Sequence, residues 1–382
     1  MPPESCRRLS TAILLVLVAL LLFCSTASAA RSSAGALDRR VDALTRQTLL
    51  TQPATALVDP ARQAGALRRA HWTVAGWILI ALFEAAALFY LWSSGGAAAL
   101  RDRLRRGMSR EWDVRFLFGA SLALVARLAA FLPSFYLYRV DRTLDLTFEL
   151  TRWWLLYWVS HTLLAMVVAG LIAAIVLGLV ARTHQWYVYT IIGILAACVA
   201  WAYVRPYVTL PSSHAVYVRA PRSEVPVLVE ILPGSTPGEV EFAAASELGH
   251  IVHGDQLSIA LIEGGVIIVF SALAVVIADR IRFRRDDDPL SRLAIVGALL
   301  ALVYLVAVPV RNAALRSYEL DADRYAVALT GNPADAVRAL VRAGDQRMIE
   351  VCPEMTAKLF LYTAPGVGAR VAAINHVPAA CP

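Results

Sequence analysis

The segment Ser246-Glu247-Leu248-Gly249-His250 carries residue types and a spacing that could do metal-dependent chemistry. In the helical pattern H-E-x-x-H, two histidines four residues apart bind zinc on one face and the glutamate beside the first acts as a base. Glu247 and His250 occupy the positions of that base and of the second histidine. Ser246 stands where the first histidine would be, and a neutral hydroxyl is a poor zinc ligand compared with imidazole. Ser246 is therefore a degenerate ligand position.

A catalytic zinc needs three protein ligands and one open position for water. Glu319 and Asp323 lie four residues apart in a segment that is expected to be helical, so both face the same way. Glu319 could supply a ligand, and Asp323 could hold a ligand by hydrogen bonding. His253, three residues after His250, is a possible substitute ligand, although it would carry the metal one turn away from Glu247. The sequence leaves three alternatives open. The zinc protease site is no longer functional, or an altered site binds one zinc ion, or some proteolysis remains.

The composition indicates a membrane protein, because 58% of the residues are hydrophobic, only 17% are charged, and the mean hydropathy is +0.59. Several apolar runs are long enough to cross a bilayer as helices. They lie near residues 11–29, 73–93, 114–137, 153–181, 187–204, 260–279 and 293–310. We therefore expect an all-α membrane protein with about seven transmembrane helices, of which the first could instead be a signal peptide that ends at residue 29.

The remaining segments divide around these spans. Residues 30–72 form a polar segment that is expected to be helical with a break at Pro60, and 73–204 hold the next spans. In 205–258, two β-branched runs predict two strands, followed by a helix that Ser235 or Thr236 caps and that carries Glu247 and His250. A transmembrane hairpin at 259–310 and a helical C-terminal part at 311–382 complete the chain.

Three short segments, in this order, resemble the CAAX prenyl endopeptidase group of integral-membrane zinc metalloproteases. They are SELGHIVHGD, then SYELDADRYA after two spans, and finally LYTAPGVGARVAAI. The resemblance implies a small α+β metalloprotease-like soluble part, one zinc ion and peptide hydrolysis. It implies that Glu247 is the general base, that His250 and Glu319 are zinc ligands, that Asp323 supports a ligand, and that Arg370 is the family's catalytic arginine.

The departures from that family are as informative as the matches. Ser246 replaces the first ligand, and Ala364 stands where the family has a histidine before Pro365. The stretch before the SELGH helix is shorter than in the family, and no Asn-Ala strand is found that would align a substrate. These losses favour a pseudoprotease that holds peptide or lipid-like ligands with impaired or lost proteolysis. The alternative is an active zinc endopeptidase with an altered metal site, in which Glu247 activates a zinc-bound water.

Four ionisable residues interrupt the apolar runs, where charge is costly and usually faces a partner or water: Glu84, Arg127, His161 and Glu263. Glu84 and Arg127 are expected to be partners on adjacent spans, with His161 and Glu263 at the interface. A hydrated helical chamber, which the family resemblance implies, is the alternative.

The membrane orientation follows from arginines in two loops, near residues 101–110 and 280–292. The positive-inside rule makes that side cytoplasmic, which puts the candidate site on the periplasmic side of a bacterial inner membrane. The resemblance implies the opposite side. Cys352 and Cys381 are expected to be either a disulfide or two free thiols. The expected partners are the lipid bilayer and a peptide or membrane-protein substrate, and not nucleic acid, because the arginines lie in short loops between spans.

Overall fold

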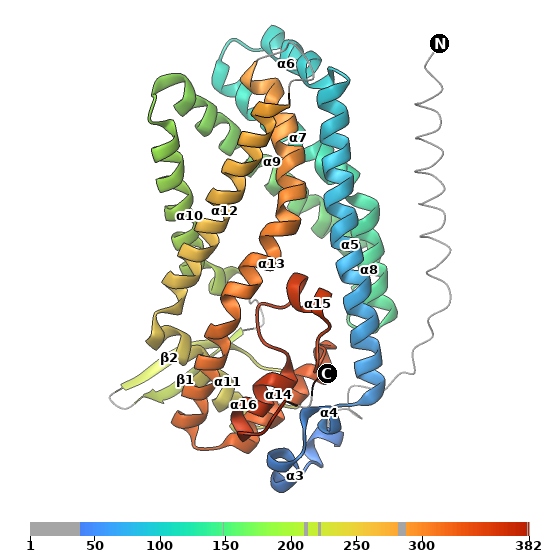
Figure 1. Ribbon diagram of the computed structural model, residues 1–382, viewed down its shortest axis with the longest axis vertical. Coiled ribbons are helices and arrows are strands. Elements are labelled where there is room, and N and C mark those ends of the chain that lie inside the picture. Colours follow the sequence, from blue (N-terminus) through green and yellow to red (C-terminus); the bar gives the residue numbers. More distant parts are fainter. Residues whose placement is uncertain are drawn as a thin grey trace. The chain divides into compact units, whose positions relative to one another are not determined.

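The computed structural model describes residues 39–147, 149–209, 213–220, 223–281, 288–379 and 381 (Figure 1). The chain divides into two compact units. Within the described ranges, unit 1 comprises residues 75–177 and 288–301, and unit 2 comprises residues 39–74, 178–281 and 302–381. The apolar run near 11–29, with its alternative as a signal peptide, lies outside the described residues.

Long apolar helices dominate the described part of the chain. Five are long and apolar enough to span a membrane: α5 (Pro60–Ser93), α9 (Thr151–Arg182), α10 (Trp186–Thr209), α12 (Asp255–Arg280) and α13 (Pro289–Thr330). A sixth candidate is the pair α7 (Glu111–Ala129) and α8 (Phe131–Thr143), which is bent by 49°. Many large apolar side chains on these helices are exposed, which is costly in water and favourable in lipid. The prediction of a mostly helical membrane protein is therefore confirmed.

Unit 1 contains the bent pair, α6 (Gly96–Gly107) and most of α9. A Cβ atom on Gly119 of α7 would lie 2.6 Å from the Ala169 carbonyl oxygen, so glycine permits α7 and α9 to pack closely. Arg127, near the bend, lies 5.9 Å from the centroid of the Trp158 ring, and it interacts electrostatically with Glu84 as expected of partners on adjacent spans.

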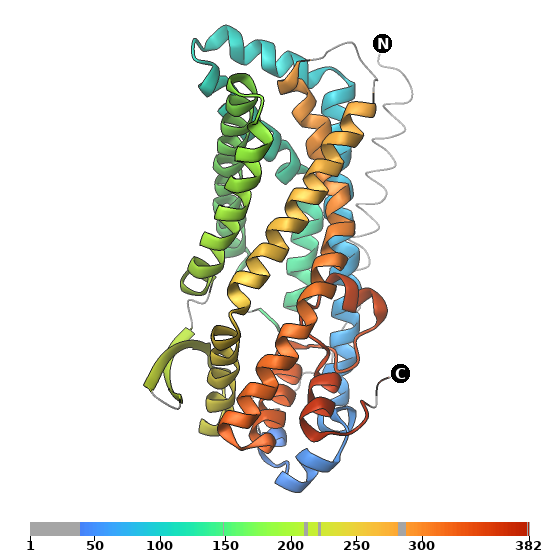
Figure 2. The same cartoon turned by 60° about the vertical axis from the view of Figure 1, so that its left-hand side comes forward.

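In unit 2, α10 packs along α12 (Figure 2). The helix α13 continues without interruption from its apolar part into the segment 319–323, which carries the candidate residues of the second motif. One helix runs across the predicted division at residue 310 and accommodates Pro309 in its interior. The guanidinium of Arg311 donates from Nε to Glu263 Oε1 at 3.0 Å. Glu263, which was expected at the interface, is thus paired with Arg311 of the neighbouring helix α13.

The strands β1 (Ser213–Ala220) and β2 (Ser223–Glu230) form an antiparallel hairpin, in which residue 213 pairs with 230 and residue 220 with 223. The two predicted strands are confirmed. The hairpin lies against α11 (Pro237–His253), with Val227 and Val229 packed on Ala244 and Leu248.

The start of α11 was anticipated correctly. Thr236 is its N-cap, Pro237 lies in the first turn, and Thr236 and Glu239 form a reciprocal capping box. Asn332 precedes α14 (Pro333–Arg347), but its side chain does not cap the helix. The Asn332 amide donates instead to the Asp335 carboxylate.

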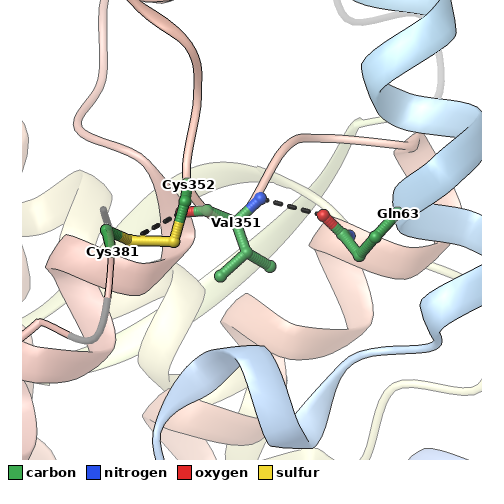
Figure 3. The surroundings of a disulfide bond; sticks show 4 residues. All are labelled: Gln63, Val351, Cys352 and Cys381. Carbon is green, nitrogen blue, oxygen red and sulfur yellow. Dashed lines mark hydrogen bonds between the residues drawn. A yellow bond between two sulfur atoms is a disulfide. The ribbon is translucent and has the colours of Figure 1, made fainter.

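The largest core cluster of unit 2 joins the polar N-terminal segment to the C-terminal helices. Val41, Leu49 and Leu57 are buried against Val337 and Val371. The segment contains α3 (Arg46–Thr51) and α4 (Ala54–Leu57), and Pro60 begins α5 rather than interrupting a helix, because proline suits the first helical turn. The C-terminal elements are α15 (Met355–Phe360) and α16 (Val367–Asn375), and a disulfide joins Cys352 to Cys381 (Figure 3).

Candidate functional site

Close packing of two helices in unit 2 brings the separated sequence segments together. Gly249 of α11 faces Ala322 of α13, where a Cβ atom on residue 249 would lie 3.1 Å from the Ala322 Cα. Ala322 is fully buried. Glycine and alanine at this crossing let the two backbones approach closely, and so His250 and Glu319 come within reach of one another.

A pocket of about 270 Å³ lies beside α11. Its lining includes most of the candidate residues, namely Ser246, Glu247, His250, Glu319 and Arg370. The structure therefore assembles side chains that are more than one hundred residues apart in the sequence, and it gives them access to a common cavity.

His250 is held by a carboxylate that the sequence reasoning did not single out. Its Nδ1 atom lies 2.8 Å from Oδ2 of Asp255, whose side chain is only 6% exposed. A carboxylate can only accept, so Nδ1 carries the proton and Nε2 faces the other way. Nε2 lies 3.8 Å from Oε1 of Glu319. The spacing of five residues between His250 and Asp255, across the turn after α11, was the signal that could have revealed this contact.

Asp323 does not hold either candidate ligand. Both of its oxygens accept hydrogen bonds from Arg370, from Nε and Nη2, each at 2.7 Å. Arg370 Nη2 also lies 3.7 Å from Oε2 of Glu319. Burial alone would lower the pKa of Arg370, but the bonds and charges of Asp323 and Glu319 outweigh it and raise this pKa above its ordinary value. Arg370 thus stays charged beside the pocket.

Two other predicted residues lie apart from this cluster. His253 is exposed, its ring stands edge-on to Tyr325 with 5.7 Å between centroids, and it is not among the residues that line the pocket. Ala364 lies in the turn before α16 and does not line the pocket either. A role for His253 as a substitute ligand stays a prediction.

The donor set does not fit a three-ligand zinc site. Zinc in proteins is bound by cysteine, histidine, aspartate and glutamate, with three such ligands at a catalytic centre. His250 and Glu319 supply two, and the third position on α11 carries the Ser246 hydroxyl. Among the described residues, no group of three or more of these residue types is arranged to hold a metal.

The rest of the pocket is formed by a strand and by α14. The end of β2 and the residues after it, from Leu228 to Leu232, line one side, and Ala339, Leu340 and Ala343 of α14 line another. In the described part of the chain the sheet has two strands, so β1 covers only one edge of β2. The sequence reasoning found no Asn-Ala strand, but a strand end does lie beside the site, with the residues Leu228, Val229 and Glu230.

A buried ion pair fixes the start of α11 to α14. Arg342 and Glu239 are each about 1% exposed at their side chains, and Arg342 Nε lies 3.1 Å from Glu239 Oε2. Arg342 also donates to Asp42 at 2.6 Å, which ties the N-terminal segment to the same point. The glutamate that completes the capping box of α11 therefore also anchors the wall of the pocket.

Comparisons with known proteins find similarity over the region that contains the pocket. Residues 207–377 match the family model described as Peptidase family M48. The chain is 32% identical over 171 residues to Protease HtpX homolog 1 of Streptomyces coelicolor, which covers 42% of this chain and 54% of that protein. It is 31% identical over 169 residues to a Protease HtpX homolog of Albidiferax ferrireducens, covering 40% and 58%. Protease HtpX of a Psychrobacter species is 33% identical over 82 residues, covering 21% and 27%.

The chain thus spans about half the length of two of these relatives and about a quarter of the third. The region 207–377 contains the hairpin of β1 and β2, and it also contains α11 and α13. These similarities support a membrane metalloprotease-like protein related to the M48 peptidases, and they do not extend to the narrower prenyl-endopeptidase assignment. In its region 207–377 the chain is similar to peptidase family M48.

Proposed function

We propose that this protein is a membrane-embedded, metalloprotease-like polypeptide-binding protein with impaired or lost proteolysis. One observation carries the proposal: Ser246, Glu247, His250, Glu319 and Arg370 line a single pocket, while only His250 and Glu319 occupy ligand positions of the zinc-binding pattern. The pocket of a peptidase is retained in a chain whose donor set is incomplete.

An extended polypeptide suits this pocket better than a lipid chain does. The edge of β2 that β1 does not cover can pair with an extended segment through main-chain hydrogen bonds. Beside it, the alanines and Leu340 of α14 offer an apolar wall for side chains. Glu230 and Arg347 form an ion pair at 2.8 Å, and both line the pocket. Main-chain pairing together with mixed apolar and charged walls is typical of peptide recognition.

The proposal is tested with fluorescein-labelled casein as a generic unfolded polypeptide and the full chain in detergent. We expect binding in fluorescence anisotropy without cleavage on a gel. Ala343→Trp places an indole in the pocket and should weaken binding at least tenfold. Ala328→Trp, on an exposed face of α13, is the matched control and should bind as the wild type does. Cleavage that disappears in Glu247→Gln would support the active endopeptidase instead, and equal binding by both tryptophan variants would refute the pocket as the binding site.

We further propose that the pocket faces the periplasm. The helix α12 leads from Asp255, which binds the pocket residue His250, to Arg280 at its other end, and its 26 residues make it about 39 Å long. The arginine-rich end is expected to be cytoplasmic. The disulfide between Cys352 and Cys381 lies in the same unit as the pocket and suits an oxidising compartment. A reporter fused after Pro382 that is active only in the cytoplasm would overturn this orientation.

A further inference from the structure

A buried carboxyl group lies in the connector between α14 and α15, residues 348–354, which we call the Glu350 connector. Glu350 is only 3% exposed. In the part of the chain that the structure describes, neither of its carboxylate oxygens makes a well-formed hydrogen bond, and the Tyr362 hydroxyl is the polar neighbour that acts on them. Burying an ionised carboxylate without hydrogen bonds costs several kcal/mol, in the range of about 3–5 for an uncompensated buried charge. The proposed function does not involve this group.

The Glu350 connector is fastened on both sides. From α5, Gln63 donates to the Ile349 carbonyl at 3.2 Å and accepts from the Val351 amide at 3.0 Å. On the other side, the Val351 carbonyl accepts from the Gly368 amide at 2.9 Å. Figure 3 shows Val351 between Gln63 and the disulfide of the neighbouring Cys352. A displacement of the connector is therefore transmitted to both α5 and α16.

The position of the Glu350 connector matters because it contacts α16, the helix that carries Arg370. Gly368 is two residues before Arg370, and a Cβ atom on Gly368 would lie 3.0 Å from the Val351 carbonyl oxygen. The connector thus packs directly on the first turn of the helix whose arginine binds Asp323 and lines the pocket. Loosening the connector would release the main constraint on that first turn.

Titratable groups surround Glu350 from each element packed against it. His71 and Arg69 belong to α5, Glu354 precedes α15, and Tyr362 follows α15. Burial raises the pKa of Glu350 to about 7, and the charge of Glu354 adds to this, whereas Tyr362 and His71 act in the opposite direction. Burial also raises the pKa of Tyr362 to about 12, so its hydroxyl keeps its proton throughout the neutral range.

We propose that Glu350 is a proton-sensitive device that controls how firmly α16 and Arg370 are held at the pocket. With its proton bound, the neutral carboxyl is compatible with the packed connector. When the proton leaves to solvent, the charge must be hydrated, and the connector opens from α5 and α16. Because the pKa in the folded chain lies above the ordinary value, this contribution to stability is complete below about pH 4.5. It is lost as the pH rises through about 7.

The test uses the full chain in detergent and its apparent melting temperature between pH 6.5 and 8. Wild-type protein should lose roughly 2 °C across this window, because about 0.8 kcal/mol of the linkage falls within it, and amide exchange in residues 367–375, corrected for the intrinsic pH dependence, should accelerate. Glu350→Gln should remove both changes. Glu241→Gln, at an exposed site on α11 away from the connector, is the matched control and should keep the wild-type profile. Asp345, whose pKa burial raises to about 6, titrates mostly below this window.

A second variant keeps the test decisive if Glu350→Gln folds poorly. The Tyr362 hydroxyl lowers the pKa of Glu350, so Tyr362→Phe should move the midpoint of the transition to higher pH. The same pH profile in wild type and Glu350→Gln would overturn the proposal, as would an unshifted midpoint in Tyr362→Phe.

Discussion

His250 and Asp255 form a buried contact in which the imidazole Nδ1 lies 2.8 Å from the carboxylate. This contact fixes the ring so that Nε2 points toward Glu319. The orientation of His250 therefore depends on Asp255, which follows the turn after α11.

Loss of this contact should destabilise unit 2. In Asp255→Ala the imidazole N–H is left buried without an acceptor, which costs about 1–3 kcal/mol. We expect the apparent melting temperature of the full chain in detergent to fall by several degrees. The control is Asp321→Ala, which removes an exposed carboxylate paired only with Arg324 across the surface. Equal melting temperatures for Asp255→Ala and wild type would contradict the structural role of Asp255.

Gly249 should be sensitive to the smallest side chain. Gly249→Ala places a Cβ atom 3.1 Å from the backbone of Ala322 and must push α11 away from α13. The result should be a loss of roughly 1–3 kcal/mol, the range for overpacking a tight core, together with weaker casein binding. Gly265→Ala is the matched helical control, since a Cβ there meets nothing within 4 Å. A harmless Gly249→Ala would mean that the two helices do not cross closely.

The Glu239–Arg342 pair should behave as a buried ion pair in a double-mutant cycle. Each side chain is 1% exposed, so Arg342→Met removes the cation that pairs with the buried Glu239 and should cost about 3–5 kcal/mol. Glu239→Gln should cost less, because Arg342 keeps its bond to Asp42. The double variant should cost much less than the sum of the two. Urea unfolding followed by tryptophan fluorescence measures this coupling, and strictly additive effects would show that the two groups do not interact.

Reduction of the disulfide should loosen the C-terminal part. Cys352 and Cys381 are 29 residues apart, and closing a loop of that length stabilises a fold by about 3–4 kcal/mol in the chain-entropy model. Dithiothreitol should therefore lower the melting temperature of wild-type protein and leave Cys352→Ser with Cys381→Ser unaffected. Cys198→Ser, which removes a cysteine that is not in the disulfide, should respond to dithiothreitol as wild type does.

Local signals predicted much of this protein, because they depend on short stretches. Apolar runs revealed the spans, and the Thr236-Pro237-Glu239 pattern revealed where α11 begins. The spacing of Glu319 and Asp323 predicted that both face one way, and Arg370 contacts both. These features need only the periodicity of a helix or the chemistry of its first turn.

Contacts between distant residues could not be read in the same way. The pairing of Arg342 with Glu239, or of Glu263 with Arg311, depends on which helices meet. Asp323 was expected to support a ligand, yet Arg370 takes both of its oxygens. Several partners for each charge are compatible with the spacing alone. The partner of each charge is decided by which helices pack together. For the site, these are α11 against α13, and α16 against α13.

We propose that Ser246 leaves the site with too few ligands for zinc, and the metal content of the purified full chain can decide this. Zinc per chain is measured by mass spectrometry after purification without chelators, in wild type and in Ser246→His with Ser246→Ala as the control. We expect substoichiometric zinc in wild type and Ser246→Ala, and close to one ion per chain in Ser246→His. One zinc ion per wild-type chain that disappears in Glu319→Ala would contradict it.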